Sequence, residues 1–142
     1  MIFGNIWGLK PGIRDNKIEY ISLIASQNNA AMIALTESHL KERINDYEIH
    51  IDGFTSIRSD RSVREGGGIV VYIKDNLTIS DDFNDSDSMN ELSCVYINEI
   101  KVALVTVYRP PDSTKESFIW SLRKINDLVS HLCLLDRYFL KI

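Results

Sequence analysis

The stretch Ala31-Met-Ile-Ala-Leu-Thr-Glu-Ser-His39 decides the fold and supplies the first candidate for a functional site. Its apolar part, Ala31 to Leu35, predicts a buried β-strand. Glu37 follows that strand, and a carboxylate at the end of a buried strand is costly unless a cation meets it. Ligands of open α/β sheets bind at the carboxyl ends of strands. We therefore identify Glu37 as a candidate metal ligand; the alternative is a solvated glutamate that opens the next turn.

A β-α-β unit contains this strand. Residues Ile2 to Trp7 predict a first strand, with Asn5 inside it. Asn16-Lys-Ile-Glu19 has the pattern of a capping box and predicts the start of a helix. The apolar residues that follow recur at helical spacing and are expected to face the sheet: Ile18, Ile21, Ile24 and Ala25. The strand–helix–strand order predicts a right-handed crossover and, in the simplest case, two parallel strands.

Four further strands are predicted along the chain, at residues 54–58, 69–74, 92–97 and 102–108. The strand at 69–74 is nearly continuous in Ile, Val and Tyr, which indicates a central position. Residues 59–68 and 81–90 are read as polar loops, and Asn98 to Lys101 as a hairpin turn.

A long amphipathic helix is predicted after the last of these strands. Ser113-Thr-Lys-Glu116 has the pattern of a second capping box. Apolar residues then recur at steps of three and four and are expected to be largely buried against a sheet: Phe118, Leu122, Ile125, Val129 and Leu132. Residues Leu134 to Ile142 either continue this helix, or Tyr138 to Ile142 begin a strand.

Length and composition predict a single domain over residues 1–142, because 142 residues with 44% hydrophobic content are enough for a core. No apolar run is long enough for a membrane span and no secretory signal is visible, so we expect an intracellular protein, nuclear or cytoplasmic. Cys94 and Cys133 lie in different predicted elements, which favours free thiols. The net charge of −4 does not attract nucleic acid to the whole chain, but Arg58, Arg61 and Arg64 form a local basic cluster.

Five motifs in this order and spacing resemble the endonuclease/exonuclease/phosphatase superfamily, and within it the endonuclease domain of non-LTR retrotransposons. They are Asn5 in the first strand, Leu35-Thr-Glu-Ser38, Arg58-Ser-Asp-Arg61, the glycine-rich entry Gly66 to Gly68 before a strand, and Tyr108-Arg-Pro-Pro111. Each motif alone is weak, whereas the ordered set is fairly specific. The resemblance covers residues 2–132 and corresponds to the N-terminal portion of the domain.

The resemblance implies an α/β fold, a partial four-layer sandwich of two packed mixed β-sheets flanked by helices. It also implies phosphodiester hydrolysis of DNA with Mg²⁺ as the cofactor. By residue, it implies Asn5, Glu37 and Tyr108 as catalytic residues and Glu37 as the metal ligand. Asn5 has the alternative role of an edge or turn asparagine, and Tyr108 that of a core tyrosine with a wet hydroxyl.

The resemblance further implies contacts to nucleic acid from arginines, whose planar guanidinium binds two phosphate oxygens at once. The candidates are Arg58, Arg61, Arg64 and Arg109. A solvated charged loop is the alternative.

The chain also departs from the family pattern. It contains neither the Gly-Asp-x-Asn motif nor the later Ser-Asp-His, so we expect an incomplete or degenerate copy with weak activity and weak Mg²⁺ binding. Asp82-Phe83-Asn84 and Ser130-His131 carry some of the motif residues in the wrong places. His39 is interpreted as a surface histidine; the alternative is a group that supports Glu37 from behind the metal ligand.

Two other functions remain open at this stage: a non-enzymatic binding protein derived from such a domain, and a phosphodiesterase acting on a small molecule. DNA is the expected partner and no membrane is expected. An exposed sheet edge, or the surface that the missing half would cover, would permit self-association.

Overall fold

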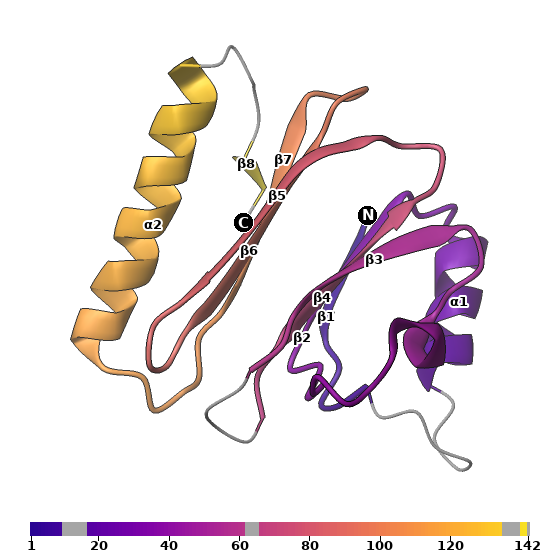
Figure 1. Cartoon of the computed structure of the whole chain (residues 1–142), viewed down its shortest axis with the longest axis horizontal. Helices are drawn as coiled ribbons and strands as arrows, with labels where there is room; N and C mark the ends of the chain where they lie inside the picture. Colours follow the sequence, from indigo (N-terminus) through magenta and orange to yellow (C-terminus); the bar gives the residue numbers. More distant parts are fainter. Residues whose placement is uncertain (10–16, 62–65, 135–139, 142) are drawn as a thin grey trace. The chain divides into compact units, whose positions relative to one another are not determined.

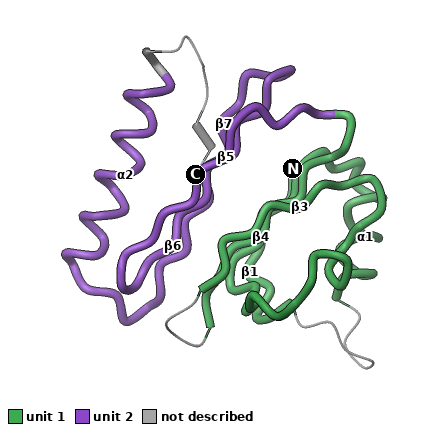
Figure 2. The backbone as a smooth tube through the Cα atoms, viewed as in Figure 1, with its two compact units in different colours: residues 1–76 green, residues 77–142 purple. Residues whose placement is uncertain are grey.

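The computed structural model describes residues 1–9, 17–61, 66–134 and 140–141. The chain divides into two compact units, residues 1–76 and 77–142, which Figure 2 shows in different colours. Each unit contains one four-stranded sheet and one α-helix within the described residues. The protein therefore has an α/β fold, as predicted, and the two units are described in turn.

The sheet of the first unit is mixed and has the strand order β1-β2-β4-β3 (Figure 1). Strands β1 and β2 are parallel and are joined through helix α1, whereas β4 pairs antiparallel with both β2 and β3. This confirms the predicted β-α-β unit and the interior position of β4. The bounds are β1 (Ile2–Asn5), α1 (Lys17–Gln27), β2 (Met32–Thr36), β3 (Phe54–Ser59) and β4 (Ile69–Lys74).

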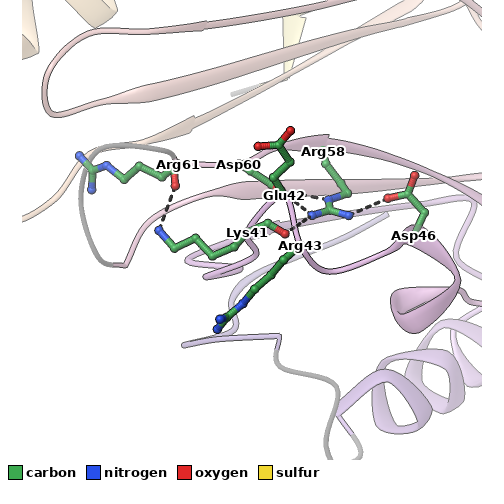
Figure 3. Close-up of a pocket in the computed structure, with 7 residues that line it drawn as sticks. All are labelled: Lys41, Glu42, Arg43, Asp46, Arg58, Asp60 and Arg61. Carbon is green, nitrogen blue, oxygen red and sulfur yellow. Dashed lines mark hydrogen bonds and ion pairs between the residues drawn. The ribbon is translucent and has the colours of Figure 1, made fainter.

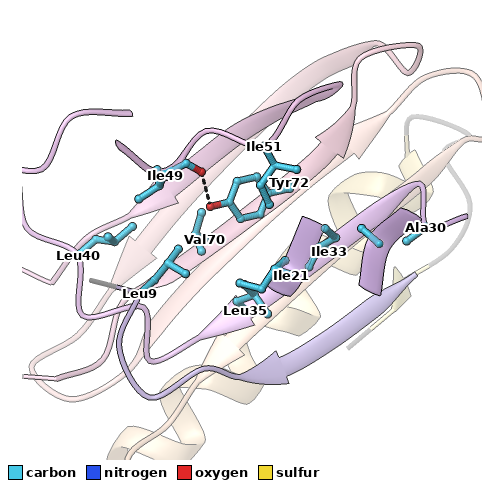
Figure 4. Close-up of a cluster of buried hydrophobic side chains, with 11 residues drawn as sticks. Leu9, Ile21, Ala30, Ile33, Leu35, Leu40, Ile49, Ile51, Val70 and Tyr72 are labelled. Carbon is cyan, nitrogen blue, oxygen red and sulfur yellow. Dashed lines mark hydrogen bonds between the residues drawn. The ribbon is translucent and has the colours of Figure 1, made fainter. Parts of the chain in front are cut away.

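One apolar cluster holds this unit together (Figure 4). Helix α1 contributes Ile21 and Ala25, at the spacing that the sequence predicted. The short 3₁₀-helix η1 (Asp46–Ile49) lies in a segment whose structure the sequence left open, and its Ile49 is fully buried. Tyr72 of β4 places its ring in the cluster and donates its hydroxyl proton to the carbonyl oxygen of Ile49, at 2.9 Å. Its polar end is therefore satisfied inside the core.

The sheet of the second unit has the strand order β5-β6-β7-β8. Strands β5, β6 and β7 pair antiparallel, and the short β8 is parallel to β7. The turn between β6 and β7 is closed by the Lys101 N–H, which donates to the carbonyl of Asn98 at 3.2 Å, so the predicted hairpin is confirmed. The bounds are β5 (Ile79–Ser86), β6 (Glu91–Ile97), β7 (Val102–Tyr108), α2 (Lys115–Leu134) and β8 (Leu140–Lys141).

The polar loop predicted at residues 81–90 is wrong over most of its length, because β5 occupies residues Ile79–Ser86. Five of the last six residues of β5 are Asp, Asn or Ser, types that are depleted in strands. The strand forms because its backbone pairs along β6, and polar side chains suit a sheet edge that must not recruit another chain.

The burial predicted for helix α2 is wrong in its first two turns. Phe118 and Leu122 are 44% and 49% exposed, whereas Ser117 and Ser121 are buried. The reason is a polar contact that apolar spacing does not reveal: the side-chain amide of Asn90 donates to the Ser117 carbonyl at 2.6 Å and to Ser121 Oγ at 2.9 Å. The helix packs against the apolar cluster of the sheet through Trp120, Ile125, Leu128 and Leu132.

The start of α2 differs from the prediction by one residue. The Thr114 hydroxyl accepts a hydrogen bond from the Ser117 N–H at 3.2 Å, so Thr114 and not Ser113 caps the helix. Within the described residues, neither α1 nor α2 is long and apolar enough to cross a membrane.

Candidate active site

The candidate site lies where β1 and β2 end in the first unit. Asn5, the last residue of β1, pairs in register with Thr36, the last residue of β2, and Glu37 follows directly. Strands β1 and β2 are neighbouring and parallel, as predicted, so the backbones of Asn5 and Glu37 lie at the same end of the sheet. Their catalytic roles stay a prediction.

Backbone hydrogen bonds hold residues 37–39 between two other segments. On one side, the N–H groups of Gly8 and Leu9 donate to the carbonyls of Glu37 and Ser38, at 2.7 and 2.6 Å. On the other side, the Ser38 and His39 N–H groups donate to the carbonyls of Gly68 and Gly67, at 3.2 and 2.9 Å. The position of Glu37 therefore depends on three separate stretches of the chain.

The backbone around Glu37 is strained. Glu37 and His39 both have left-handed conformations, with φ of 55° and 52°, which cost a non-glycine residue roughly 1–2 kcal/mol each. Gly68 is required beside them, because a Cβ at that position would lie 2.6 Å from Ser38 Oγ. Such strain persists only where surrounding contacts enforce it, and it concentrates at functional sites.

The Glu37 carboxylate is the least satisfied charged group of this site. The residue is 8% exposed, and its Oε2 is buried with no hydrogen-bond partner among the described residues. The His39 Nε2 lies 3.8 Å from this oxygen, which is beyond hydrogen-bond distance. Hard divalent cations bind oxygen ligands, and a buried carboxylate oxygen without a hydrogen-bond partner can serve as one. The Glu37 Oε2 atom therefore fits a divalent metal.

The carboxylate is not part of a larger ligand cluster. Within the described part of the chain, no group of three or more His, Cys, Asp or Glu side chains could hold a metal ion. Mg²⁺ is often bound through one or two carboxylates, with water and substrate phosphates completing its shell. Glu37 alone therefore fits one side of such an ion and requires the substrate to supply another.

Asn5 shapes the loop that follows β1. It is exposed, and its side-chain oxygen accepts a hydrogen bond from the Trp7 N–H at 3.1 Å, the geometry of an Asx turn. Asn5 therefore makes the contact expected of a turn asparagine, which was the alternative to its catalytic role.

Lys17, the first residue of α1, holds the same loop. Its ammonium donates to the carbonyls of Ile6, Trp7 and Gly8, at 3.1, 3.1 and 2.9 Å. Sequence reasoning missed Lys17, because its partners are backbone carbonyls that no side-chain pattern announces.

Tyr108 and Arg109 belong to the second unit. Tyr108 ends β7 opposite Glu91 and is partly buried. Arg109 is exposed; its Nη1 donates to Ser113 Oγ at 2.7 Å, and its guanidinium lies 5.5 Å from the centre of the Phe118 ring. Their participation in a site with Glu37 stays a prediction.

Arg58 has a structural role in the first unit (Figure 3). Its five N–H donors reach the carboxylates of Asp46 and Asp60 and the carbonyls of Lys41 and Ile44. Burial lowers the pKa of Arg58, but the hydrogen bonds that it donates to Asp60 and Asp46, together with their negative charges, outweigh burial and raise it overall. A phosphate would have to compete with these contacts, which fix residues 41–46 to β3.

Of the other two arginines in this cluster, Arg61 is described and Arg64 lies outside the described residues. The Arg61 carbonyl accepts a hydrogen bond from Lys41 Nζ at 2.9 Å. An open cavity of about 930 Å³ lies here, lined by Lys41, Glu42, Arg43, Asp46, Arg58, Asp60 and Arg61. Sequence reasoning did not select Lys41 and Arg43 as candidates for this basic surface. They follow Glu37 by only four and six residues, and this closeness could have identified them.

Comparisons with solved structures identify the fold. The chain is similar to an AP endonuclease from Archaeoglobus fulgidus, with 15% identity, a TM-score of 0.60 and coverage of 92% of this chain and 50% of that one. It is similar to TDP2 from D. rerio complexed with a single-strand DNA product, with 13% identity, a TM-score of 0.64 and coverage of 91% and 54%. It is also similar to the 3′ phosphatase NExo from Neisseria bound to a product DNA hairpin, with 13% identity, a TM-score of 0.58 and coverage of 75% and 40%.

These neighbours are members of the endonuclease/exonuclease/phosphatase superfamily, so the resemblance drawn from the sequence is confirmed at the level of the fold. The chain spans about half the length of the structures it matches, or less. No protein-family model and no curated protein matches it.

Proposed function

We propose that this chain is the N-terminal part of a metal-dependent, phosphodiester-hydrolysing DNA endonuclease domain of retrotransposon type. The observation that carries the proposal is the buried, unpartnered Oε2 of Glu37 at the end of β2. The fold supports it, since the structural neighbours include an AP endonuclease and DNA-bound enzymes. The ordered motifs Leu35-Thr-Glu-Ser38 and Tyr108-Arg-Pro-Pro111 favour the retrotransposon branch over a small-molecule phosphodiesterase.

In this proposal Glu37 holds one side of a divalent cation, Mg²⁺ in the cell. When bound, the ion polarises the phosphate and stabilises charge on the leaving oxygen. Asn5 orients the phosphate from the neighbouring strand, and Tyr108 offers its hydroxyl to the scissile phosphate. Arg61, Arg64 and Arg109 bind phosphates of the DNA backbone as charged donors. Arg58 supports this surface by holding residues 41–46 in place.

We further propose that the chain by itself is a weak enzyme. Its sequence offers no Gly-Asp-x-Asn and no Ser-Asp-His to align and deprotonate the attacking water. General acid–base catalysis contributes roughly 10²- to 10⁴-fold, so its loss leaves binding without efficient turnover.

Metal binding provides the direct test. Mn²⁺ binding to the full chain is measured by electron paramagnetic resonance or calorimetry, with Glu37→Gln as the variant and Glu42→Gln as the control. Glu42 is also close in sequence but exposed. We expect Glu37→Gln to abolish binding that Glu42→Gln retains. Equal binding by both variants, or no binding by the unmodified chain even with a DNA strand present, would overturn the metal site.

The second candidate function is a non-enzymatic nucleic-acid-binding protein. The observation that favours it is that, in the described residues, Glu37 is not part of a group of three or more His, Cys, Asp or Glu side chains that could hold a metal ion. DNA affinity measured first in EDTA and then, without EDTA, in Mn²⁺ separates the two. Affinity that is unchanged by Mn²⁺ and by Glu37→Gln supports the binding protein, whereas affinity that rises with Mn²⁺ only in the unmodified chain supports the endonuclease site.

A further inference from the structure

The indole of Trp7 is largely exposed to solvent. Trp7 is 74% exposed, although a tryptophan side chain offers roughly 150–250 Å² of surface for burial. It follows β1 directly and lies on the loop that Asn5 and Lys17 hold. Folding gains little from this side chain, and most of its surface is open to a ligand.

The loop that carries Trp7 is firmly fixed. Trp7 itself has a left-handed backbone, with φ of 49°. Its N–H donates to Asn5 Oδ1 and its carbonyl accepts from the Lys17 ammonium, both at 3.1 Å. The N–H groups on either side, of Ile6 and Gly8, donate to the carbonyls of Thr36 and Glu37, at 3.0 and 2.7 Å. The exposed ring is therefore attached to a fixed backbone, which reduces the entropy lost when a ligand binds to it.

The same contacts place Trp7 beside the candidate metal ligand. The centre of its ring lies 6.0 Å from that of His39, with the two planes tilted by 56°. The His39 Nε2 lies 3.8 Å from Glu37 Oε2. A tilted neighbour of this kind leaves most of the indole surface open, as the exposure of Trp7 confirms.

We propose that Trp7 is a stacking platform for an unpaired nucleobase. This base would lie next to the phosphate that binds at the Glu37 site. This inference rests on the proposed function and names a feature of its substrate: a single-stranded or locally unpaired segment at the site. An indole face suits any base, and stacking on an aromatic side chain contributes without sequence preference. A paired base in a duplex is already stacked, so Trp7 distinguishes unpaired from paired substrate.

Fluorescence tests this contact. The sequence contains two tryptophans, Trp7 and Trp120, so Trp120→Phe leaves Trp7 as the single reporter. The full chain with this substitution is titrated in EDTA with an oligo(dT) strand and with a blunt duplex of equal length. We expect quenching of Trp7 by the strand and much less by the duplex. Affinity is measured in parallel by anisotropy of a labelled strand.

Substitutions at Trp7 provide the second arm. Trp7→Ala is expected to weaken strand binding roughly 5- to 150-fold, the range of one base stack, whereas Trp7→Phe retains most of the affinity. Tyr47→Ala is the matched control, since Tyr47 is 78% exposed but lies on η1. Circular dichroism confirms that each variant is folded.

The outcomes separate this inference from the proposed function. Strand binding that neither quenches Trp7 nor depends on it overturns the stacking platform and leaves the DNA-binding function standing. Quenching by the duplex as strong as by the strand also overturns the preference for unpaired bases. Absence of binding to any DNA overturns the proposed function, and the stacking platform with it.

Discussion

At the scale of single residues, Glu37 combines burial, charge and backbone strain. A buried carboxylate oxygen without a partner costs folding energy unless a ligand repays it. A buried group that is kept for ligand binding lowers the stability of the ligand-free protein, a trade-off that is common at active sites. The stability of the metal-free protein therefore provides a test that does not depend on activity.

Replacing Glu37 by Gln should stabilise the metal-free protein. Removing the charge relieves the desolvation cost of the buried oxygen, and the expected gain is about 1–3 kcal/mol in the free energy of unfolding. Urea denaturation in EDTA measures it, with Glu42→Gln as an exposed control expected to change stability by about 0.5 kcal/mol or less. A loss of stability in Glu37→Gln would show that the carboxylate is already satisfied by the protein.

Cys94 should make the stability of the folded protein decrease at alkaline pH. Its thiol is buried, and burial, together with the smaller effect of the nearby Asp81 charge, raises its pKa to about 11. The folded thiol stays protonated where the unfolded thiol ionises. The contribution of Cys94 to stability is therefore fully present below the unfolded pKa of about 8.5 and is lost as the pH rises toward 11.

The corresponding measurement compares the unmodified chain with Cys94→Ala at pH 8 and at pH 10.5. The unmodified chain should lose roughly 2–3 kcal/mol more than the variant over this interval, because the shift corresponds to about two pKa units. Parallel declines in the two proteins would show that the thiol is accessible to solvent in the folded state.

At the scale of the secondary-structure elements, sequence periodicity located most strands and misjudged one helix face. Strands β2, β4, β6 and β7 are rich in apolar residues and were predicted to within a residue. Strand β5 was missed, because its polar residues follow from its position at a sheet edge. Edge position is a property of the assembled sheet, and no local pattern carries it.

Helix α2 also depends on a tertiary contact, with Asn90, that no local sequence pattern reveals. The apolar spacing correctly selected Ile125 and Leu132 as packing residues. It also selected Phe118 and Leu122, which are exposed because the amide of Asn90 draws Ser117 and Ser121 inward. A partner that lies about thirty residues away in the sequence decided which face of the helix is buried.

Two alanine substitutions in α2 should differ clearly in their effect. Leu128→Ala should cost about 1–3 kcal/mol, since Leu128 packs against the buried cluster of the second unit. Leu122→Ala should cost about 1 kcal/mol or less, because Leu122 is about half exposed and alanine favours helices. Urea denaturation provides both values, and equal costs would contradict the orientation of the helix.

The candidate site was only partly predictable for a related reason. Glu37 and Asn5 were found because they end apolar strands. The support that Lys17 gives to three carbonyls, and the exposure of Trp7, arise only when the loop after β1 meets α1 and residues 37–39. The role of Arg58 in holding residues 41–46 is likewise a product of tertiary contacts, although its basic character had suggested phosphate binding.

At the scale of the whole molecule, the chain has an α/β fold similar to that of the AP endonuclease structure, and within the described residues Glu37 is not part of a group of three or more side chains that could hold a metal ion. Glu37 can hold one side of a cation, and phosphates of DNA can supply other ligands. Hydrolysis also requires a water that is aligned and deprotonated, and alignment alone accounts for several kcal/mol of a catalysed barrier. Asp82, on the edge strand β5, and His131, exposed near the end of α2, line one small pocket of the second unit, and neither belongs to a metal-ligating group of three or more side chains within the described residues.

Supercoiled plasmid incubated with the full 142-residue chain and Mg²⁺ or Mn²⁺ should therefore stay uncut above background, even under conditions in which Mn²⁺ binding is measured. The Glu37→Gln variant is the control for contaminating nucleases, since any nicking that both proteins share does not come from this site. Nicking by the unmodified chain that Glu37→Gln abolishes would contradict the prediction of weak activity. It would mean that a group within these residues activates the water, and substitution of His39, 3.8 Å from the carboxylate, would be the first step in finding it.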